Sequence, residues 1–409
     1  MGTTISAGDT AWLITATALV LFMTLPGLAL FYAGLVRAKN ALSILIQCFA
    51  ITCLVSLLWW ALGYTLTFGD GGTHQGLIGG LGKAFLAGVG RNAVTGAVPE
   101  TAFFMFQLTF AVITPALVIG GFAERVKFSA VLLFSALWFL LVYVPVAHWV
   151  WGGGWLATRG VMDFAGGIVV HTNAGTAAIV CALVVGKRRG FPTVAMPPHS
   201  LPLTVCGAGM LWVGWYGFNA GSALAANGNA GMAMLTTHLG ASSGVLAWML
   251  IEWARYGKPS LLGVVTGMVA GLGTITPASG FVGPAGAVVI GLAAGAVCYF
   301  ATQYLKRVLK VDDSLDVSPV HGVGGVIGTL LTGILVSAAF GGVGFPPGRS
   351  MAEQVLTQAI GVGATIAWCA VVTWLILRLL SMTVGLRVTD EQETEGLDLA
   401  AHGERGYSP

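Results

Sequence analysis

Eleven apolar stretches, most of them as long as a membrane span, constrain the fold of this chain more than any other feature. A membrane-spanning helix needs about 20 mostly apolar residues, because it rises about 1.5 Å per residue through hydrocarbon about 30 Å thick. The stretches cover residues 11–34, 42–68, 99–121, 127–147, 163–186, 201–223, 230–254, 261–276, 283–305, 318–340 and 352–384. The eighth is short, and the last is long enough to project from the bilayer. We therefore expect an all-α polytopic membrane protein with eleven transmembrane helices.

The composition excludes several other classes of protein. Charged residues make up 9% of the chain, apolar residues 56%, and mean hydropathy is +0.85, which is unlike a soluble domain of 409 residues. The net charge of +3 is small and the basic residues lie in short loops, so we expect no nucleic-acid partner. All six cysteines fall inside apolar stretches without CxxC or Cys/His spacing, which argues against both a disulfide framework and a zinc site. We expect no cofactor and no metal.

One short pattern resembles an enzyme motif. The sequence Gly240-Ala-Ser-Ser-Gly244 matches the spelling of a nucleophile elbow, but it lies in the middle of an expected span with no strand before it. We therefore do not expect an enzyme.

Lysine and arginine are unevenly divided between alternate loops. Twelve lie in one set of loops: Arg37, Lys39, Arg125, Lys127, Lys187, Arg188, Arg189, Arg255, Lys258, Lys306, Arg307 and Lys310. Four lie in the other set: Lys83, Arg91, Arg159 and Arg349. Because cytoplasmic loops carry the excess, we expect the N-terminus outside and the C-terminus in the cytoplasm.

The first ten expected spans divide into two halves of five, followed by a long eleventh helix. An odd number of spans per half places the halves in opposite orientations, which is the inverted-repeat plan of many transporters. An Asp-to-His stretch opens the last span of each half, Asp163 to His171 and Asp316 to His321. Ionisable residues inside a membrane are costly and usually functional. Two such histidines in corresponding halves therefore indicate a transport path.

Several longer motifs carry a resemblance to a known family. They are Phe31-Tyr-Ala-Gly-Leu-Val-Arg-Ala-Lys-Asn40, Gly121-Phe-Ala-Glu-Arg125, Asp163-Phe-Ala-Gly-Gly167, Gly214-Trp-Tyr-Gly-Phe-Asn-Ala-Gly-Ser222, Gly257-Lys-Pro-Ser260 and Val311-Asp-Asp313. From about residue 10 to 407 the chain resembles the bacterial ammonium transporter family. The resemblance implies a homotrimer in the bacterial plasma (inner) membrane, with one narrow pore for ammonium in each protomer.

The resemblance also implies an outer site and a gate. Trp151, Ser222 and Phe110 match the residues that recruit ammonium outside, and Phe110 and Phe218 match the stacked rings that close the pore below them. An aromatic face attracts a cation by roughly 0.5 to 2 kcal/mol, and a serine oxygen can accept one of its protons. Taken alone, Trp151 would more often belong to an interfacial aromatic belt.

His171 and His321 match the twin histidines of the family's pore, whose rings share a hydrogen bond. Either residue alone could equally be a satisfied core histidine. At about 1.5 Å per residue, His171 lies roughly 12 Å below the outer surface and His321 only about 7 Å from Asp316. The rings can therefore meet only if the cytoplasmic end of span ten is recessed or bent, which Pro319 allows. We assign Asp163 to site architecture, as a helix cap, because a naked carboxylate would bind ammonium too tightly for passage.

The tail after Leu386 is acidic, a composition typical of a solvated segment. Two short stretches, 385–388 and 395–398, nevertheless match the family's ordered cytoplasmic tail, which accompanies docking of a PII signalling protein. We therefore divide the chain into a membrane domain, residues 1–388, and a C-terminal regulatory tail, residues 389–409.

The resulting expectation is an ammonium transporter. Ammonium is captured outside, loses a proton near the phenylalanines, and crosses as ammonia past the histidines. One alternative is an ammonium sensor that signals through the tail with little flux. A second alternative makes the histidines haem ligands in an electron carrier.

Overall fold

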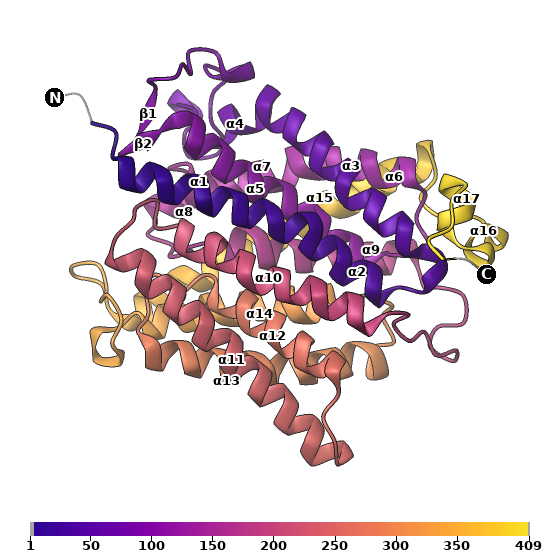
Figure 1. Ribbon diagram of the computed structural model, residues 1–409. Coiled ribbons are helices and arrows are strands. Elements are labelled where there is room, and N and C mark those ends of the chain that lie inside the picture. Colours follow the sequence, from indigo (N-terminus) through magenta and orange to yellow (C-terminus); the bar gives the residue numbers. More distant parts are fainter. Residues whose placement is uncertain (1–3, 408–409) are drawn as a thin grey trace.

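The computed structural model describes residues 4–407, which fold into one bundle of helices that run side by side (Figure 1). Within this part of the chain, ten helices are long and apolar enough to cross a membrane: Ala7–Leu35, Ala38–Phe68, Glu100–Gly121, Phe128–Thr158, Gly167–Val185, Leu201–Gly221, Gly228–Tyr256, Pro284–Val308, Ser318–Leu335 and Met351–Thr383. The N- and C-termini lie at opposite ends of the bundle (Figure 1). We call these ends the N-side and the C-side.

Several of these helices are interrupted or tightened along their length. The first five are built from α1 (Ala7–Phe22), η1 (Met23–Leu28) and α2 (Ala29–Leu35); η2 (Ala38–Asn40), α3 (Ala41–Leu58), η3 (Trp59–Gly63) and α4 (Tyr64–Phe68); α5 (Glu100–Val118) and η6 (Ile119–Gly121); α6 (Phe128–Trp138), η7 (Phe139–Tyr143), α7 (Val144–Trp151) and α8 (Trp155–Thr158); and η8 (Gly167–Thr172) and α9 (Asn173–Val185). The others are α10 (Leu201–Gly221), α11 (Gly228–Tyr256), α13 (Pro284–Gln303) with η9 (Tyr304–Val308), η10 (Ser318–Gly322) with α14 (Val323–Leu335), and α15 (Met351–Thr383).

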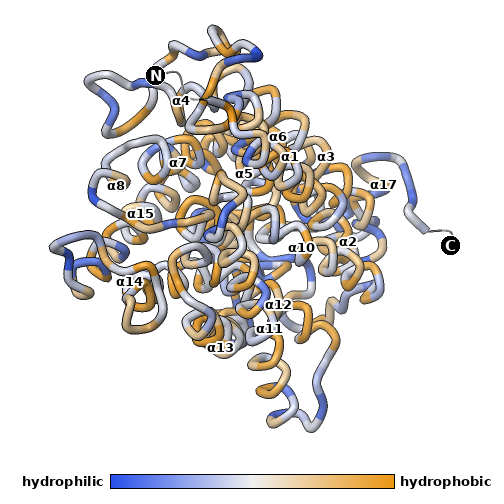
Figure 2. Tube along the Cα trace, turned by 60° about the vertical axis from the view of Figure 1, so that its left-hand side comes forward, coloured by the Kyte–Doolittle hydropathy of each residue, from blue (hydrophilic) through white to orange (hydrophobic). Residues whose placement is uncertain are grey.

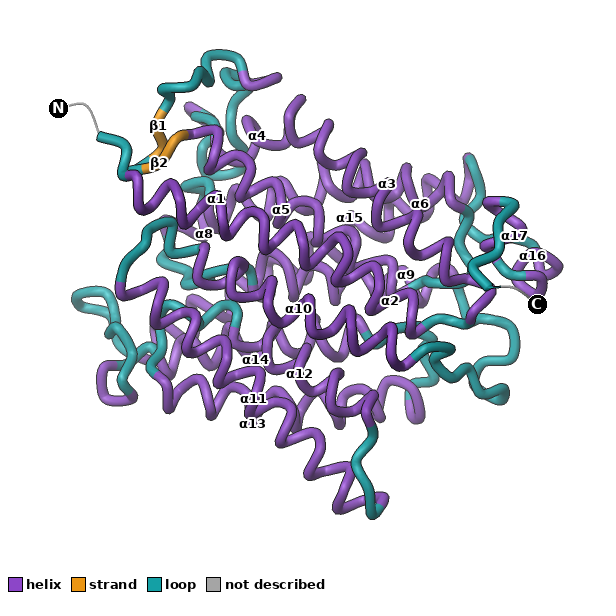
Figure 3. The backbone as a smooth tube through the Cα atoms, in the orientation of Figure 1, coloured by secondary structure: helices purple, strands orange, loops and turns teal. Residues whose placement is uncertain are grey.

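Several short elements lie in the connections between the spans. They are η4 (Gly72–His74), η5 (Ala84–Leu86) and η11 (Ala338–Phe340), and the two strands β1 (Val94–Thr95) and β2 (Val98–Pro99), which pair antiparallel. Figure 3 shows how small the strands are beside the helices. Hydrophilic segments gather in the loops and the tail, and hydrophobic residues follow the helices (Figure 2).

The expected eighth span is shorter in the structure than the sequence argument assumed. It is the apolar helix α12 (Leu261–Ile275), whose 15 residues rise only about 22 Å. Residues 276–282 continue the path without a helix and are buried almost throughout. Non-helical backbone is tolerated at membrane depth where protein covers it and its polar groups are bonded. The amide of Phe164 and the hydroxyl of Thr236 supply such bonds, to the oxygens of Pro277 and Ser279. The count of eleven full spans is therefore not confirmed, and the described residues hold ten spans and this short helix.

The two halves of the chain meet along a stripe of glycines on α10. A Cβ atom added at Gly207 would lie 2.2 Å from the Phe31 nitrogen, and one at Gly214 would lie 2.4 Å from the Met23 side chain. Small residues let helix backbones approach closely in a membrane. This close approach sets the position of α10, and with it the position of Phe218 near the end of that helix.

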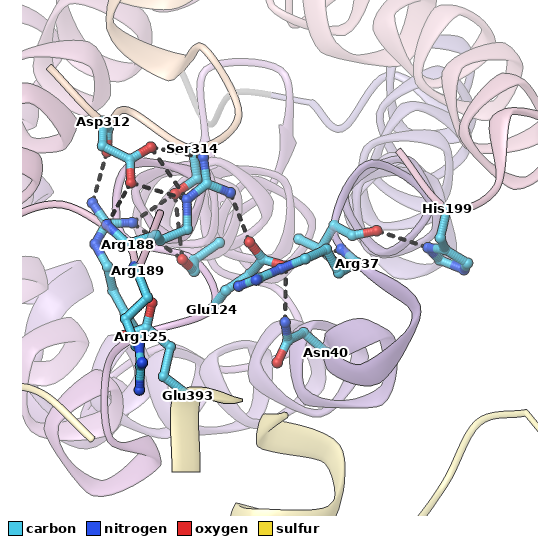
Figure 4. Close-up of polar contacts among 12 residues, drawn as sticks. Arg37, Asn40, Glu124, Arg125, Arg188, Arg189, His199, Asp312, Ser314 and Glu393 are labelled. Carbon is cyan, nitrogen blue, oxygen red and sulfur yellow. Dashed lines mark hydrogen bonds and ion pairs between the residues drawn. The ribbon is translucent and has the colours of Figure 1, made fainter. Parts of the chain in front are cut away.

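Buried ion pairs fasten the loops on the C-side (Figure 4). Glu124 accepts hydrogen bonds from the Arg37 Nε at 2.9 Å and from the Arg188 Nη1 at 2.6 Å, and Arg188 also binds Asp312 at 2.7 Å. Burial raises the pKa of Glu124, but Arg188 and Arg37 outweigh it and leave that pKa below its ordinary value. The loop that precedes His321 is therefore tied to the loops after the first, third and fifth spans.

The acidic tail is ordered and packs back on the C-side. It forms α16 (Asp390–Glu395) and α17 (Leu397–His402). Asp398 accepts hydrogen bonds from the amides of Leu42 and Ser43, at 3.1 and 2.7 Å, and so caps the first turn of α3. Glu393 binds Arg387 at 2.7 Å and the Arg189 amide at 2.7 Å. The structure thus has the ordered tail that the motifs suggested; residues 1–3 and 408–409, at the ends of the two expected regions, lie outside the described residues.

Candidate functional site

A cavity of about 280 Å³ opens on the N-side between α5, α7 and α10. Its lining includes Trp151, Phe110 and Ser222, which the sequence analysis assigned to recruitment of substrate. The Trp151 and Phe110 rings meet edge to face, with centroids 5.8 Å apart. The Ser222 hydroxyl donates to the Phe218 oxygen at 2.8 Å, which leaves the hydroxyl oxygen able to accept. The cavity therefore offers aromatic faces and an oxygen acceptor to a small cation.

Two phenylalanine rings close this cavity from below. The Phe110 and Phe218 rings have centroids 4.2 Å apart and are tilted by 34°. Each residue is 1% exposed. Phe106, one helical turn before Phe110, packs against it with centroids 5.0 Å apart. Rings at this distance are in contact, so a molecule can pass between them only if the rings move.

Asp163 organises the backbone beside the N-side cavity. Its buried carboxylate accepts four amide hydrogen bonds, from residues 166, 167, 168 and 169, at 2.6 to 3.1 Å. These amides belong to the turn that begins η8, the element that carries His171. The Asp163 main-chain oxygen also accepts from the Trp151 indole at 2.9 Å. Asp163 therefore links Trp151 to the start of the His171 helix and has no carboxylate oxygen left without a backbone partner.

His171 and His321 lie against each other in the centre of the bundle. Their Nδ1 atoms are 3.2 Å apart, their ring centroids are 5.2 Å apart, and the rings are inclined by 20°. The two residues are 1% and 4% exposed. Each sits in a π-helical turn, η8 or η10, at the start of its span.

Span ten is recessed in the way that the contact between the histidines requires. Its helix begins only at Ser318, after a buried non-helical segment that follows Val311. The two histidine-bearing spans also approach very closely, since a Cβ at Gly175 would lie 2.2 Å from the Gly322 Cα. The carboxylate that caps η10 belongs to Asp313, which accepts from the Ser318 amide at 2.6 Å. Asp316 instead binds Lys306 at 2.7 Å.

Three separate cavities lie in order along these parts. Between the phenylalanines and the histidines lies a small cavity of about 10 Å³, lined by Trp215, Phe218, His171 and His321 among others. Beyond His321 a C-side cavity of about 140 Å³ is lined by Tyr32, Lys306 and Asp316 among others. The His171 Nε2 has no hydrogen-bond partner among the described protein atoms. The bundle therefore contains one line of sites from the N-side to the C-side.

The geometry of the histidines disfavours the haem alternative. Two nitrogens that ligate one metal ion from opposite sides stand about 4 Å apart, at about 2 Å each from the metal. The facing Nδ1 atoms are only 3.2 Å apart, a hydrogen-bonding distance. Trp215, which the sequence analysis did not single out, stacks on His171 with centroids 5.5 Å apart and fills the space beside it.

The other intramembrane histidine of interest, His238, lies away from this line. It is exposed on α11, and its Nδ1 is 2.7 Å from the Tyr216 hydroxyl. It takes no part in the row of cavities.

Comparisons with known proteins agree on one family. The family model described as Ammonium Transporter Family matches residues 11–407. An ammonium transporter of Aquifex aeolicus is 46% identical over 411 residues, with 99% of this chain and 94% of the relative covered. An ammonium transporter of Bacillus subtilis is 44% identical, with 98% of each chain covered.

Solved structures agree with this result. A protein described as a sensor Amt protein superposes with a TM-score of 0.90 at 32% identity, over 97% of this chain and 98% of its own. Mep2 of Saccharomyces cerevisiae superposes with a TM-score of 0.86 at 37% identity, over 95% of this chain and 91% of its own.

Proposed function

The chain belongs to the ammonium transporter family, and we propose that it binds ammonium at the N-side cavity, removes one proton and passes ammonia along the histidines. One observation carries this proposal: the N-side cavity, the phenylalanine pair, the histidine pair and the C-side cavity follow one another in a single row. Each step below is the chemistry that these groups allow.

Recruitment depends on the aromatic rings and the serine. An ammonium ion that leaves water exchanges hydration for other contacts, and the Trp151 and Phe110 rings with the Ser222 oxygen supply such contacts. The attraction between the ammonium ion and these groups becomes stronger when water leaves the cavity, because charge interactions are screened less in a low dielectric.

Deprotonation follows from the dryness of the path below. A buried cation is disfavoured relative to its neutral form, so a closed apolar passage favours loss of a proton. The proton passes to a water molecule in the N-side cavity, which turns ammonium and water into ammonia and hydronium. The space beyond the phenylalanine pair is small and mostly apolar. Potassium cannot lose a proton and is therefore excluded by the same barrier.

The histidine pair can form hydrogen bonds with ammonia, the neutral molecule. Two neutral imidazoles provide a donor and an acceptor without placing a net charge in the bundle, and two imidazolium ions so close would repel. The His171 Nε2, which has no hydrogen-bond partner in the described part of the chain, can bond a passing ammonia molecule.

The purified protein in liposomes tests this function. We expect an ammonium pulse to give uptake of ammonia or a current, whereas an equal potassium pulse gives neither above protein-free liposomes. The reason is that only ammonium can become neutral in the dry passage. Equal responses to both ions, or no response to either, would contradict a selective ammonium pore.

A sensor remains the second candidate. It is favoured by the similarity to a protein described as a sensor Amt protein and by the tail that is fastened to the loops of the C-side. The same liposome measurement separates the two, because a sensor would bind ammonium with little flux.

Topology and assembly complete the proposal. The C-side carries the tail together with the twelve lysines and arginines counted above, so we place it in the cytoplasm of a bacterial cell and the N-side outside. The family resemblance adds a homotrimer with one pore per protomer and an inverted-repeat plan.

The tail is the proposed contact for a PII signalling protein. Deleting residues 389–409 removes α16 and α17 from the C-side surface. We expect this deletion to abolish co-purification of PII protein and to leave ammonium transport present. Full-length protein with Arg91→Gln, an exposed substitution on the N-side, is the matched control and should retain the partner. If PII protein still co-purifies after the deletion, the tail is not its contact site.

A further inference from the structure

Two side chains of opposite charge face each other at the C-side cavity, and none of the steps proposed above uses them. The Lys306 Nζ lies 2.7 Å from the Asp316 Oδ2. Both residues line the C-side cavity together with His321. The lysine side chain is 35% exposed and the aspartate side chain 21%. The ion pair therefore forms part of the wall next to which a molecule leaves the histidine pair.

The ends of two spans position this ion pair. Lys306 belongs to η9, the π-helical turn that ends the span Pro284–Val308. Asp316 lies just before η10, and its main-chain oxygen accepts from the Val320 amide at 3.1 Å. Its φ is 60°, a left-handed conformation that aspartate adopts more readily than most residues do. The carboxylate is thus held at the start of the helix that carries His321.

The Asp316 carboxylate depends on Lys306 for its hydrogen bonding. Its other oxygen, Oδ1, has no hydrogen-bond partner among residues 4–407. An ionised carboxylate can accept about four hydrogen bonds, so this group could bind further donors. Without the lysine, neither of its oxygens would have a side-chain or main-chain donor in the described part of the chain.

The other end of the path contains no carboxylate that is free to bind a cation. Asp163 accepts four backbone amides, as described above, and the residues that line the N-side cavity are uncharged. Hydrogen bonds from a cation to a carboxylate are strong, and a pore conducts only when its sites bind weakly enough for release. A free carboxylate next to the C-side cavity would therefore delay the molecule that leaves.

The leaving molecule is a cation on this side. Ammonia that reaches water at the C-side takes a proton from a water molecule, which gives ammonium and hydroxide. Ammonium has four N–H groups and no lone pair, so it is a good partner for a carboxylate. A neighbouring lysine has the same kind of donor and already occupies that position.

We propose that Lys306 occupies the Asp316 carboxylate and thereby keeps the C-side mouth of the pore from binding ammonium. The two charges cancel, so a departing ion meets a wall without net charge. This inference rests on the proposed function and adds to it a residue that controls release.

Lys306→Gln tests this role, because glutamine keeps much of the side chain and removes its charge. A slower release step lowers the maximal rate and the KM together and leaves their ratio nearly unchanged. In liposomes we expect both to fall about threefold or more, an effect of the size of a partly exposed ion pair. Potassium on both sides of the membrane should inhibit ammonium flux in the variant and not in the wild type, because a free carboxylate also attracts a cation that cannot pass.

A second variant and a control make the test specific. Lys306→Gln combined with Asp316→Asn also removes the free carboxylate, so the maximal rate, the KM and the insensitivity to potassium should return toward wild-type values. Lys310→Gln is the matched control, because Lys310 is an exposed lysine of the same connection and does not line the cavity. It should behave as the wild type does.

The outcomes separate this inference from the proposed function. A wild-type rate, KM and response to potassium in Lys306→Gln would overturn the inference. A loss of flux that the double variant does not relieve would also overturn it, because the defect would then not come from the freed carboxylate. Absence of ammonium flux in the wild-type protein would instead overturn the proposed function.

Discussion

Replacing His171 with alanine is expected to lower ammonium flux at least about tenfold or to let potassium through the pore. The ring lies between the phenylalanine pair and His321 and is stacked on Trp215. Its Nε2 has no hydrogen-bond partner among residues 4–407. Alanine removes the hydrogen-bonding groups that we propose to receive ammonia, and it leaves space that water can enter. A wetter passage screens charge more strongly, so a cation meets a smaller barrier.

The measurement is flux of ammonium and of potassium into liposomes, for His171→Ala and His321→Ala beside the wild type. His238→Ala is the matched control, because this histidine also belongs to a span but lies on the bundle surface against Tyr216. We expect the control to behave as the wild type does. If both pore variants keep the wild-type ammonium flux and still exclude potassium, the histidine pair is not needed for transport or for selectivity.

The membrane spans were largely readable from the sequence because hydrophobic length is a local property. Ten of the eleven predicted stretches are helices of sufficient length. The exception, α12, ends at Ile275, and the next residues stay buried because Phe164 and Thr236, from other parts of the chain, bond their oxygens. Such bonds join residues far apart in the sequence, and no local pattern predicts them.

In the candidate site, too, some features could be predicted from the sequence and others depend on contacts between distant parts of the chain. The residues around the N-side cavity were found through the resemblance, and the structure brings Trp151, Phe110 and Ser222 to one cavity. The contact between the histidines could not be predicted from spacing, since it depends on the recessed start of η10. Each half has an Asp-to-His stretch, but the two aspartates bind differently. Asp163 caps η8, whereas Asp313, not Asp316, caps η10. Which carboxylate meets a helix end depends on the path of the loop, and Asp316 has a positive φ and binds Lys306 instead.

His148 illustrates a signal that the sequence carries only weakly. A lone histidine near the end of a span reads as an interface residue, and its neighbours in the sequence offer no partner. Its ring nitrogens lie 2.7 Å from the main-chain oxygens of Thr67 and Gln75, in a segment about 75 residues earlier. Only the folded chain shows this contact.

The second large effect is expected at Asp163. Asp163→Ala removes the acceptor of four buried amide hydrogen bonds at the start of η8. Hydrogen bonds to a charged group contribute about 1.5 to 3 kcal/mol each, and buried donors left without partners add to the loss. The turn that carries His171 and the oxygen that holds the Trp151 indole should both lose their positions. We expect ammonium flux to fall by about a hundredfold or more, together with a lower Tm of the purified protein.

Two further variants separate the cap from other roles of the carboxylate. Asp163→Asn keeps one side-chain oxygen, which can accept from only some of the four amides, so its flux and Tm should lie between those of the wild type and Asp163→Ala. Asp316→Ala removes the corresponding aspartate of the second half, whose bond is a partly exposed ion pair with Lys306. Exposed ion pairs contribute about 0 to 1 kcal/mol, so this control should lower Tm much less. If Asp163→Ala keeps the wild-type Tm and loses only transport, the carboxylate acts on the ammonium ion directly rather than through the backbone that it caps.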